Sequence, residues 1–155
     1  MTPLRMTEEP DATDADVSAV VDSLRAFNRR HMPKGEPLPL RLMLRDEVGA
    51  IRGGLLGFTR WHWLCVEILW VADEHRGFGH GRALLDRAEA IAVARGCSRS
   101  RLDTTDFQAQ GFYERAGYRV FGTLDDLPPG SRTHWLEKSI LPAGIPTDRG
   151  PSPGP

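Results

Sequence analysis

The chain has 155 residues, of which 40% are hydrophobic and 26% charged, a composition typical of a soluble globular protein of one domain. Its 20 basic and 21 acidic residues nearly cancel, which excludes the broad positive surface of a dedicated nucleic-acid-binding protein. The most apolar stretch, Trp61 to Ala72, contains His62 and Glu67 and is too short to cross a membrane. We therefore expect a cytoplasmic protein with no nucleic-acid or membrane partner.

The first predicted element is an amphipathic helix from about Asp14 to His31. Its apolar residues recur at helical spacing: Val17, Val20, Val21, Leu24 and Phe27. Thr13 and Asp16 have the spacing of a capping box, and Pro33 follows the far end. At the other end of the chain, residues 142–155 are rich in Pro and Gly. We expect them to form a disordered tail behind a single domain of residues 1–141.

Three apolar runs then predict consecutive antiparallel strands: Leu40–Arg45, Ala50–Thr59 and Trp61–Ala72. The third run is apolar on both faces of a period-two pattern. One face would hold Leu64, Val66, Ile68 and Trp70, and the other Cys65, Leu69 and Val71. A strand covered on both sides belongs in the middle of a sheet. Glu67 stands in this run, so we expect a buried carboxylate with a specific partner or a function.

The remaining pattern predicts a helix that ends at Gly96, a strand at Ser100–Thr104 and a second helix at Asp106–Ala116. Two closing strands follow at Tyr118–Gly122 and Arg132–Ser139. The predicted fold class is therefore α/β (α+β), with a mixed, mainly antiparallel central sheet flanked by helices on both faces.

Glycines alternate in the loop that joins the third strand to the following helix, from Arg76 to Arg82. Such glycines let the backbone approach a ligand, and the free amides at a helix start attract an anion such as a pyrophosphate. Arg76, His80 and Arg82 would add charged contacts. A tight strand-to-helix turn without a ligand is the alternative interpretation of the glycines alone.

Two other anion-binding loops fit the sequence less well. A phosphate-binding loop of an NTPase needs Lys followed by Ser or Thr after its last glycine, but Arg82 and Ala83 stand there. A dinucleotide-binding loop needs G-x-G-x-x-G after the first strand of its fold, and neither condition is met. Asp103 does stand about where such folds have a ribose-binding acid, so a nicotinamide-dependent oxidoreductase stays an alternative.

Arg76-x-x-Gly79-x-Gly81 resembles the acyl-CoA pyrophosphate motif of the GNAT superfamily of N-acetyltransferases. A second block, Asp106 to Tyr118, contains Phe112-Tyr113-Glu114 and resembles that family's later signature, in the expected order and at about the expected separation. Asp106 departs from the pattern, because the family usually has an Asn there that contacts the pantetheine arm of the coenzyme. An ionised acid accepts hydrogen bonds but cannot donate them.

The resemblance implies an enzyme that moves the acetyl group of acetyl-CoA, its co-substrate, to a primary amine, and we expect that amine to belong to a small molecule. It also implies the following coenzyme-binding residues: Leu69, Val71, Arg76, Gly77, Phe78, Gly79, His80, Gly81, Arg82, Asp106 and Tyr113. No metal is expected, because the histidines lack metal-ligand spacing. Dimerisation is common among similar proteins, although no feature of this sequence indicates a homodimer.

By the same resemblance, Tyr113 protonates the sulfur of the departing coenzyme, and an amide between Leu69 and Val71 stabilises the oxyanion. Glu67 is the first candidate for the general base and His62 the second, since an imidazole titrates near neutral pH. The family builds its acceptor pocket from regions that correspond to Arg29–Pro39 and Leu124–Ser131. A module that binds acyl-CoA without turnover is the alternative function.

Overall fold

The computed structural model describes residues 3–141, which form two compact units, residues 3–35 and 36–141. The predicted tail lies outside the described residues. The first unit contains helix α1 (Asp14–His31), and its bounds and capping box are as predicted. The Thr13 hydroxyl accepts from the Asp16 amide at 3.2 Å, and the Asp16 carboxylate accepts from the Thr13 amide at 3.1 Å. Within residues 3–141, no helix is long and apolar enough to span a membrane.

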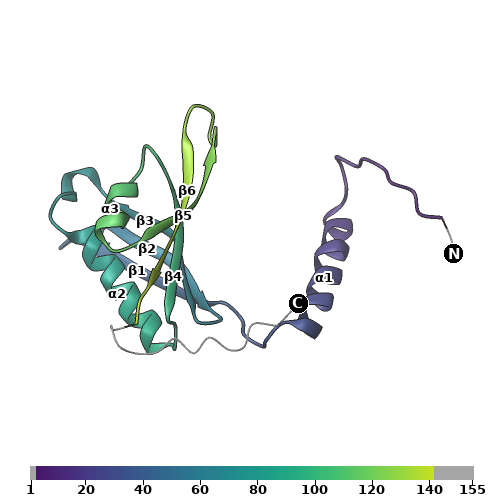
Figure 1. Cartoon of the computed structure of the whole chain (residues 1–155), viewed down its shortest axis with the longest axis horizontal. Coiled ribbons are helices and arrows are strands. Elements are labelled where there is room, and N and C mark those ends of the chain that lie inside the picture. Colours follow the sequence, from purple (N-terminus) through teal and green to yellow (C-terminus); the bar gives the residue numbers. More distant parts are fainter. Residues whose placement is uncertain (1–2, 142–155) are drawn as a thin grey trace. The chain divides into compact units, whose positions relative to one another are not determined.

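The second unit contains a six-stranded sheet in the order β1-β2-β3-β4-β6-β5 (Figure 1). Its strands are β1 (Leu38–Arg45), β2 (Ile51–Arg60), β3 (Trp63–Val71), β4 (Arg99–Thr105), β5 (Arg119–Asp125) and β6 (Arg132–Ser139). Only β3 and β4 run parallel among the paired strands of this sheet. The prediction of a mixed, mainly antiparallel sheet is confirmed.

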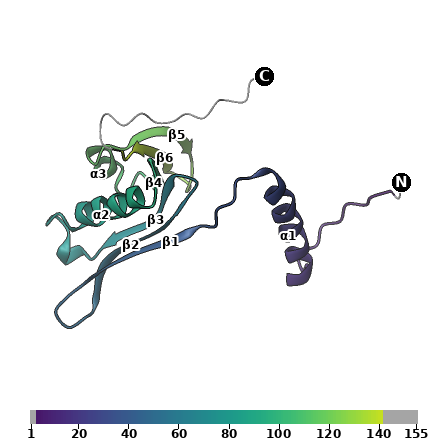
Figure 2. The same cartoon turned by 90° about the horizontal axis from the view of Figure 1, so that it is seen from below.

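Two helices of this unit, α2 (His80–Ala94) and α3 (Gln110–Arg115), pack on the same face of the sheet (Figure 2). Leu85 and Ala88 of α2 are fully buried and belong to one apolar cluster with Tyr113 of α3 and Leu136 of β6. This core fixes the start of α2 and the whole of α3 against the strands. The prediction of helices on both faces of the sheet stays a prediction, because the remaining helix, α1, belongs to the other unit.

The predicted helix that begins at Asp106 is shorter than expected, because α3 begins only at Gln110. Residues 106–109 form turns, and polar groups of Asp106 and Gln108 make hydrogen bonds to strands instead of to the helix. The Asp106 amide donates to the Arg132 carbonyl of β6 at 3.0 Å, and the Gln108 side chain accepts from the Thr105 amide at 3.0 Å. These bonds to the neighbouring strands compete with helical hydrogen bonds, so the first turn of the predicted helix does not form.

A β-bulge lies in β3 at Glu67. Leu56 of β2 pairs with Ile68 while Gly57 pairs with Val66, so Glu67 is the extra residue. Gly57 is required here, because a Cβ on it would lie 2.1 Å from a backbone carbonyl oxygen of β3. Bulges of this kind redirect side chains and are frequent beside active sites.

The bulge shifts the inward and outward alternation of β3 by one residue. Val66, before it, and Leu69 and Val71, after it, all pack against the core, whereas Ile68 and Trp70 are about half exposed on the opposite face. The prediction that Ile68 and Trp70 share a face with Val66 is therefore wrong. A strict period of two cannot hold across an inserted residue.

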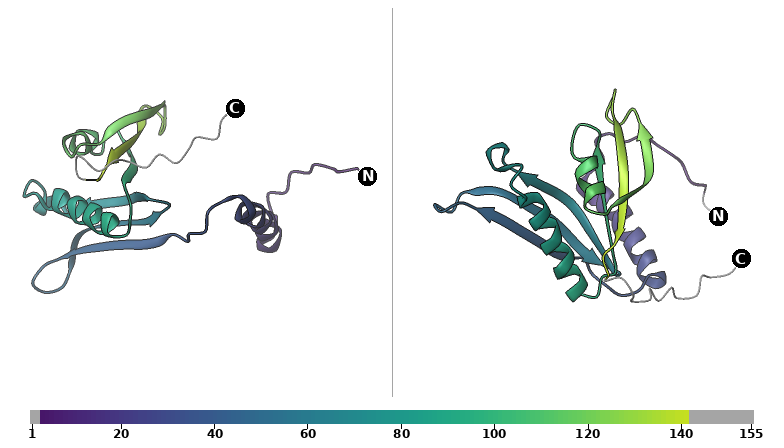
Figure 3. Two further views of the ribbon diagram at one scale, coloured as in Figure 1. Left: turned by 60° about the horizontal axis from the view of Figure 1, so that its bottom comes forward. Right: turned by 60° about the vertical axis from the view of Figure 1, so that its left-hand side comes forward.

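The sheet divides into two arms that part after a short parallel contact between β3 and β4 (Figure 3, right). These strands pair only at Trp63–Arg99, Leu64–Ser100 and Cys65–Arg101. Beyond Cys65 the two strands diverge, so the β3 edge from Val66 to Val71 has no β4 partner. At the opening between the arms, this part of β3 presents backbone that no residue of β4 pairs with.

Candidate active site

A groove of about 1030 Å³ lies at this opening, where β3, the loop after it, the start of α2, the end of β4 and α3 meet. It is lined by Glu67, Ile68, Leu69, Trp70, Val71, His75, Arg76, Gly77, Gly79, His80, Gly81, Arg82, Asp103, Thr104, Phe107, Gln108, Ala109, Phe112, Tyr113 and Arg115. The structure therefore brings together nearly all of the predicted coenzyme-binding residues. Phe78, whose side chain is exposed, and Asp106 are not part of the lining.

The glycine loop leaves its backbone amides without acceptors from the described part of the protein. Gly77 has φ +81° and Gly79, the residue that precedes α2, has φ +84°, a conformation that favours glycine. Within residues 3–141, the amides from Gly77 to Arg82 have no hydrogen-bond acceptor. Unpaired amides at the positive end of a helix form a site for an anion.

The cationic side chains of this loop also hold the protein together. Arg76 donates from Nε to the Val71 carbonyl at 2.9 Å, and its guanidinium lies 2.8 Å from the Asp73 carboxylate. Arg82 donates to Asp86, one turn further along α2, at 2.8 Å. Both guanidinium groups are about half exposed beside the groove. They fix the loop to the strand and the helix, and their exposed edges lie where an anion could bind.

The amides of Leu69 and Val71 point toward the opening. The Ala72 amide donates to the Arg52 carbonyl of β2 at 2.8 Å. Since successive amides of a strand point in opposite directions, the Val71 amide faces away from β2, and so does the Leu69 amide. The stretch that the family resemblance associates with oxyanion binding thus presents its amides to the groove.

Tyr113 of α3 lies in the groove wall with only 7% of its surface exposed. Its ring packs edge-on against the rings of Phe112 and Tyr118, at centroid distances of 5.1 and 5.9 Å. Burial, together with the negative charge of Asp103, raises the pKa of Tyr113 to about 12. Its hydroxyl has no hydrogen-bond partner within residues 3–141, and it stays protonated throughout the neutral range.

Glu67 is exposed, so the expectation of a buried carboxylate is wrong. The bulge carries it out of the apolar pattern and places it in the lining of the groove. Asp103 of β4 lies across the opening, because Glu67 and Asp103 each stand two residues beyond the last pair of the two strands, Cys65–Arg101. Sequence analysis assigned Asp103 to a dinucleotide fold and missed it as an acid of this site. No local pattern reveals that β3 and β4 are neighbours.

His62, the second candidate for the base, does not reach the groove. It lies in the turn before β3, at the end of that strand far from the glycine loop. Its Nδ1 is 2.9 Å from the Gly96 carbonyl, and its own carbonyl accepts from the amides of Ser98 and Arg99. The imidazole therefore joins the β2–β3 turn to the end of α2.

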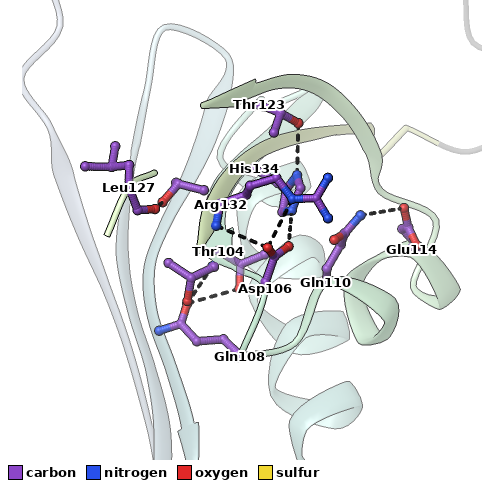
Figure 4. Close-up of polar contacts among 11 residues, drawn as sticks. Thr104, Asp106, Gln108, Gln110, Glu114, Thr123, Leu127, Arg132 and His134 are labelled. Atoms are coloured by element: carbon purple, nitrogen blue, oxygen red, sulfur yellow. Dashed lines mark hydrogen bonds and ion pairs between the residues drawn. The ribbon is translucent and has the colours of Figure 1, made fainter. Parts of the chain in front are cut away.

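Asp106 turns its carboxylate toward β6 instead of the groove (Figure 4). Oδ1 lies 2.6 Å from Nε2 of His134, and Oδ2 accepts from the backbone amide and Nε of Arg132 at 3.1 and 3.2 Å. The bond from His134, with a smaller contribution from Arg132, holds the pKa of Asp106 below its usual range. Sequence analysis did not identify His134 as a partner of this motif residue, since the two lie on separate elements.

A smaller hollow of about 340 Å³ lies beside the groove and shares Glu67 with it. It is lined by Pro37, Pro39, Arg41, Leu56, Gly57, Phe58 and Glu67. Pro37 and Pro39 of the predicted acceptor region Arg29–Pro39 therefore line this hollow. The other predicted acceptor region, Leu124–Ser131, lines neither the groove nor the hollow. It forms the end of β5 and the connection to β6.

In the part of the chain from residue 3 to residue 141, no three His, Cys, Asp or Glu side chains gather in a way that could hold a metal ion. The groove instead offers backbone amides, cations at the loop, two carboxylates and a buried phenol. These groups suit a phosphate-bearing ligand and proton transfer.

Comparison with known proteins identifies the family. The model of the acetyltransferase (GNAT) family matches residues 7–118. The chain belongs to the GNAT family of acetyltransferases. The matched region includes the glycine loop, the groove-forming strands and α3, so the family signature and the observed groove coincide.

Three relatives show how closely this GNAT chain resembles known members. It is 42% identical over 120 residues to a blasticidin-S acetyltransferase of Streptomyces morookaense, covering 76% of this chain and 88% of that protein. It is 36% identical over 129 residues to an acetyltransferase of Agrobacterium fabrum, and the match covers 83% of this chain and 94% of that protein. The crystal structure of an acetyltransferase from Bacillus cereus superposes with a TM-score of 0.81 at 30% identity, and the match covers 87% of this chain and 97% of that one.

Proposed function

We propose that this GNAT protein transfers the acetyl group of acetyl-CoA to a primary amine of a small molecule. The observation that carries the proposal is one continuous groove with unpaired loop amides at one end and the Tyr113 hydroxyl in its wall. Membership in an acetyltransferase family supports acyl transfer and removes the reason to consider a nicotinamide-dependent oxidoreductase.

In this proposal the loop holds the diphosphate of the co-substrate. The amides from Gly77 to Arg82 donate to its oxygens, and the dipole of α2 adds to the attraction. Arg82 and His80 flank the amides and supply further positive or polar groups. The positive φ of Gly79 is what allows the amides to converge, so the site depends on backbone conformation more than on the loop side chains.

Acyl transfer then requires three groups from the protein. The amine first releases its ammonium proton to solvent. The neutral nitrogen then attacks the thioester carbonyl carbon, and the Leu69 or Val71 amide stabilises the negative charge that develops on the oxygen. When the carbon–sulfur bond breaks, Tyr113 gives its proton to the departing thiolate. Glu67 accepts the proton that the amine loses, directly or through a water molecule, and solvent restores the tyrosine proton.

The acceptor approaches through the hollow that adjoins the groove at Glu67. Carboxylates at Glu67 and Asp103 attract an amine that is cationic in solution, and Phe58 with Pro37 and Pro39 offers apolar surface for its remainder. The similarity to a protein named for acetylation of blasticidin S supports a small antibiotic-like amine as the class of acceptor.

The experiment is a thiol-release assay with acetyl-CoA and a panel of amines that includes blasticidin S, short peptides and simple diamines. We expect turnover with at least one small amine, and a product whose mass increases by one acetyl group. Tyr113→Phe serves as the catalytic control, since it keeps the ring and removes the proton. Tight coenzyme binding without turnover of any amine would overturn the proposal and favour the non-catalytic acyl-CoA-binding module.

A further inference from the structure

Asp106 stands where the family motif usually has Asn, and its side chain is engaged by protein groups on both oxygens (Figure 4). His134 of β6, whose side chain is only 5% exposed, approaches one oxygen, and Arg132 of the same strand binds the other. A carboxylate held in this way is not available to a ligand in the groove. Any contribution of Asp106 to the site therefore comes through the groups that it binds.

The bonds continue from Asp106 into β5. Nδ1 of His134 lies 2.9 Å from the Thr123 hydroxyl. Because an ionised carboxylate only accepts, Nε2 of His134 donates to Asp106, and the Thr123 hydroxyl, which can donate or accept, bonds to Nδ1. The chain Asp106–His134–Thr123 thus ties the turn after β4 to both strands of the β5–β6 hairpin.

The turn that is anchored in this way forms part of the groove wall. Residues 107–109, directly after Asp106, all contribute to the lining. The Gln108 side chain, which accepts from the Thr105 amide at 3.0 Å and the Thr104 hydroxyl at 3.1 Å, closes the turn from its other side. Ala109 accepts from the Tyr113 amide at 3.2 Å, so the same turn leads directly into α3.

We propose that Asp106 is a positioning residue, which holds the wall formed by residues 107–109 through its bonds to His134 and Arg132 and so sets the affinity for the coenzyme. This inference rests on the proposed function, because it takes the groove to be the coenzyme site. Tyr113 is buried separately against Tyr118 and the core. Loosening the anchor therefore weakens coenzyme binding while leaving the proton donor in place.

The test measures the dissociation constant of CoA by titration calorimetry, together with kcat and KM, for Asp106→Ala, Asp106→Asn, His134→Phe and Thr123→Val. We expect Asp106→Ala and His134→Phe each to weaken CoA binding about 10-fold, with kcat at saturating acetyl-CoA within about 2-fold of wild type. Asp106→Asn keeps an oxygen for the Arg132 amide but turns its NH2 group toward Nε2 of His134, so its affinity should lie between those of wild type and Asp106→Ala. Thr123→Val, at an exposed position, should weaken binding about 3-fold.

A double-mutant cycle separates positioning from direct contact. If Asp106 acts through His134, then Asp106→Ala combined with His134→Phe binds CoA no more weakly than the worse single variant. Glu137 lies on β6 like His134 and forms two ion pairs, with Arg99 of β4 and Arg119 of β5. Glu137→Gln removes both pairs, is the matched control and should not change the affinity. Thermal unfolding verifies that each variant is folded. If His134→Phe does not fold, Thr123→Val, the mildest change, tests the anchor in its place.

Additive losses in the cycle, or unchanged CoA affinity in folded His134→Phe and Thr123→Val while Asp106→Ala binds weakly, would overturn the inference and indicate a direct contact. Because the titration uses CoA and needs no amine, it gives a result even if no acceptor is turned over. Failure of the proposed reaction is therefore distinguishable from failure of the anchor.

Discussion

The loop from Arg76 to Arg82 and the segment from Asp106 to Tyr113 form two walls of the same groove, but different atoms of each wall face it. The loop presents main-chain amides, while its Arg76 side chain is bound to the end of β3 and to Asp73. The second segment presents the side chain of Tyr113. The amide and the carboxylate of Asp106, in the same segment, are hydrogen-bonded to β6. Changes to backbone conformation should thus damage the first wall, and changes to side chains the second.

The largest effect is expected from Tyr113→Phe, which tests the side-chain wall. Removing the hydroxyl removes the proton for the departing thiolate and leaves the ring packed, so kcat should fall about 100-fold or more while KM for acetyl-CoA stays within about 2-fold. Steady-state kinetics with the best acceptor measure this. An unchanged kcat would show that Tyr113 is not the proton donor, and that the second wall does not act through this side chain.

Gly79→Ala tests the backbone wall. A side chain at φ +84° is strained by about 1–2 kcal/mol, and relief of that strain turns the amides out of line, so KM for acetyl-CoA should rise about 10-fold.

Gly81→Ala is the matched control for that loop variant. Its Cβ would lie 3.5 Å from the Phe112 ring, an ordinary contact, and Gly81 does not have a positive φ. We expect KM within about 2-fold of wild type. Equal losses at Gly79 and Gly81 would show that any added side chain harms the loop, and that its conformation is not the cause.

Glu67→Gln tests the acid that lies between the groove and the smaller hollow. The amide keeps the shape and cannot take a proton, so kcat/KM for the amine should fall about 10-fold, with KM for acetyl-CoA unchanged. His62→Gln is the control, because the imidazole joins the turn before β3 to Gly96 outside the groove. A greater loss in His62→Gln than in Glu67→Gln would reverse the assignment.

The smallest expected effect concerns stability at high pH. Tyr113 keeps its proton in the folded chain up to about pH 12, whereas the unfolded chain releases it near pH 10. The stability that the neutral phenol contributes is thus fully present below pH 10 and is lost as the pH rises toward 12, about 1 kcal/mol by pH 11. Urea unfolding at pH 9 and pH 11 should show a smaller decrease for Tyr113→Phe than for wild type. An identical decrease in both proteins would contradict the burial of this hydroxyl.

The sequence predicts the elements whose causes are local. Helix α1 has a capping box and a single apolar face, and the three meander strands are apolar runs separated by turn residues. The glycines at positions 77 and 79 likewise predict a loop with open amides, because glycine permits the positive φ that both residues adopt.

The features that sequence analysis missed depend on partners far along the chain. The bulge at Glu67 requires a close approach of Gly57, and it reverses the direction of Ile68 and Trp70. Asp106 is bound by His134 because β4 pairs with β6 instead of with β5, which no local pattern encodes. The motif correctly marks Asp106 as a residue of interest, but it does not identify the groups that bind its side chain.

The most direct test of the central claim is an amide NMR titration of the uniformly ¹⁵N-labelled protein with CoA. The account predicts that the amide signals from Gly77 to Arg82 shift most, because they donate to the diphosphate, with further shifts at Leu69 and Val71. Signals of the β2–β3 turn near His62 should stay in place. Saturable CoA binding that leaves the Gly77 to Arg82 amides unshifted would contradict the account, since the coenzyme would then bind elsewhere.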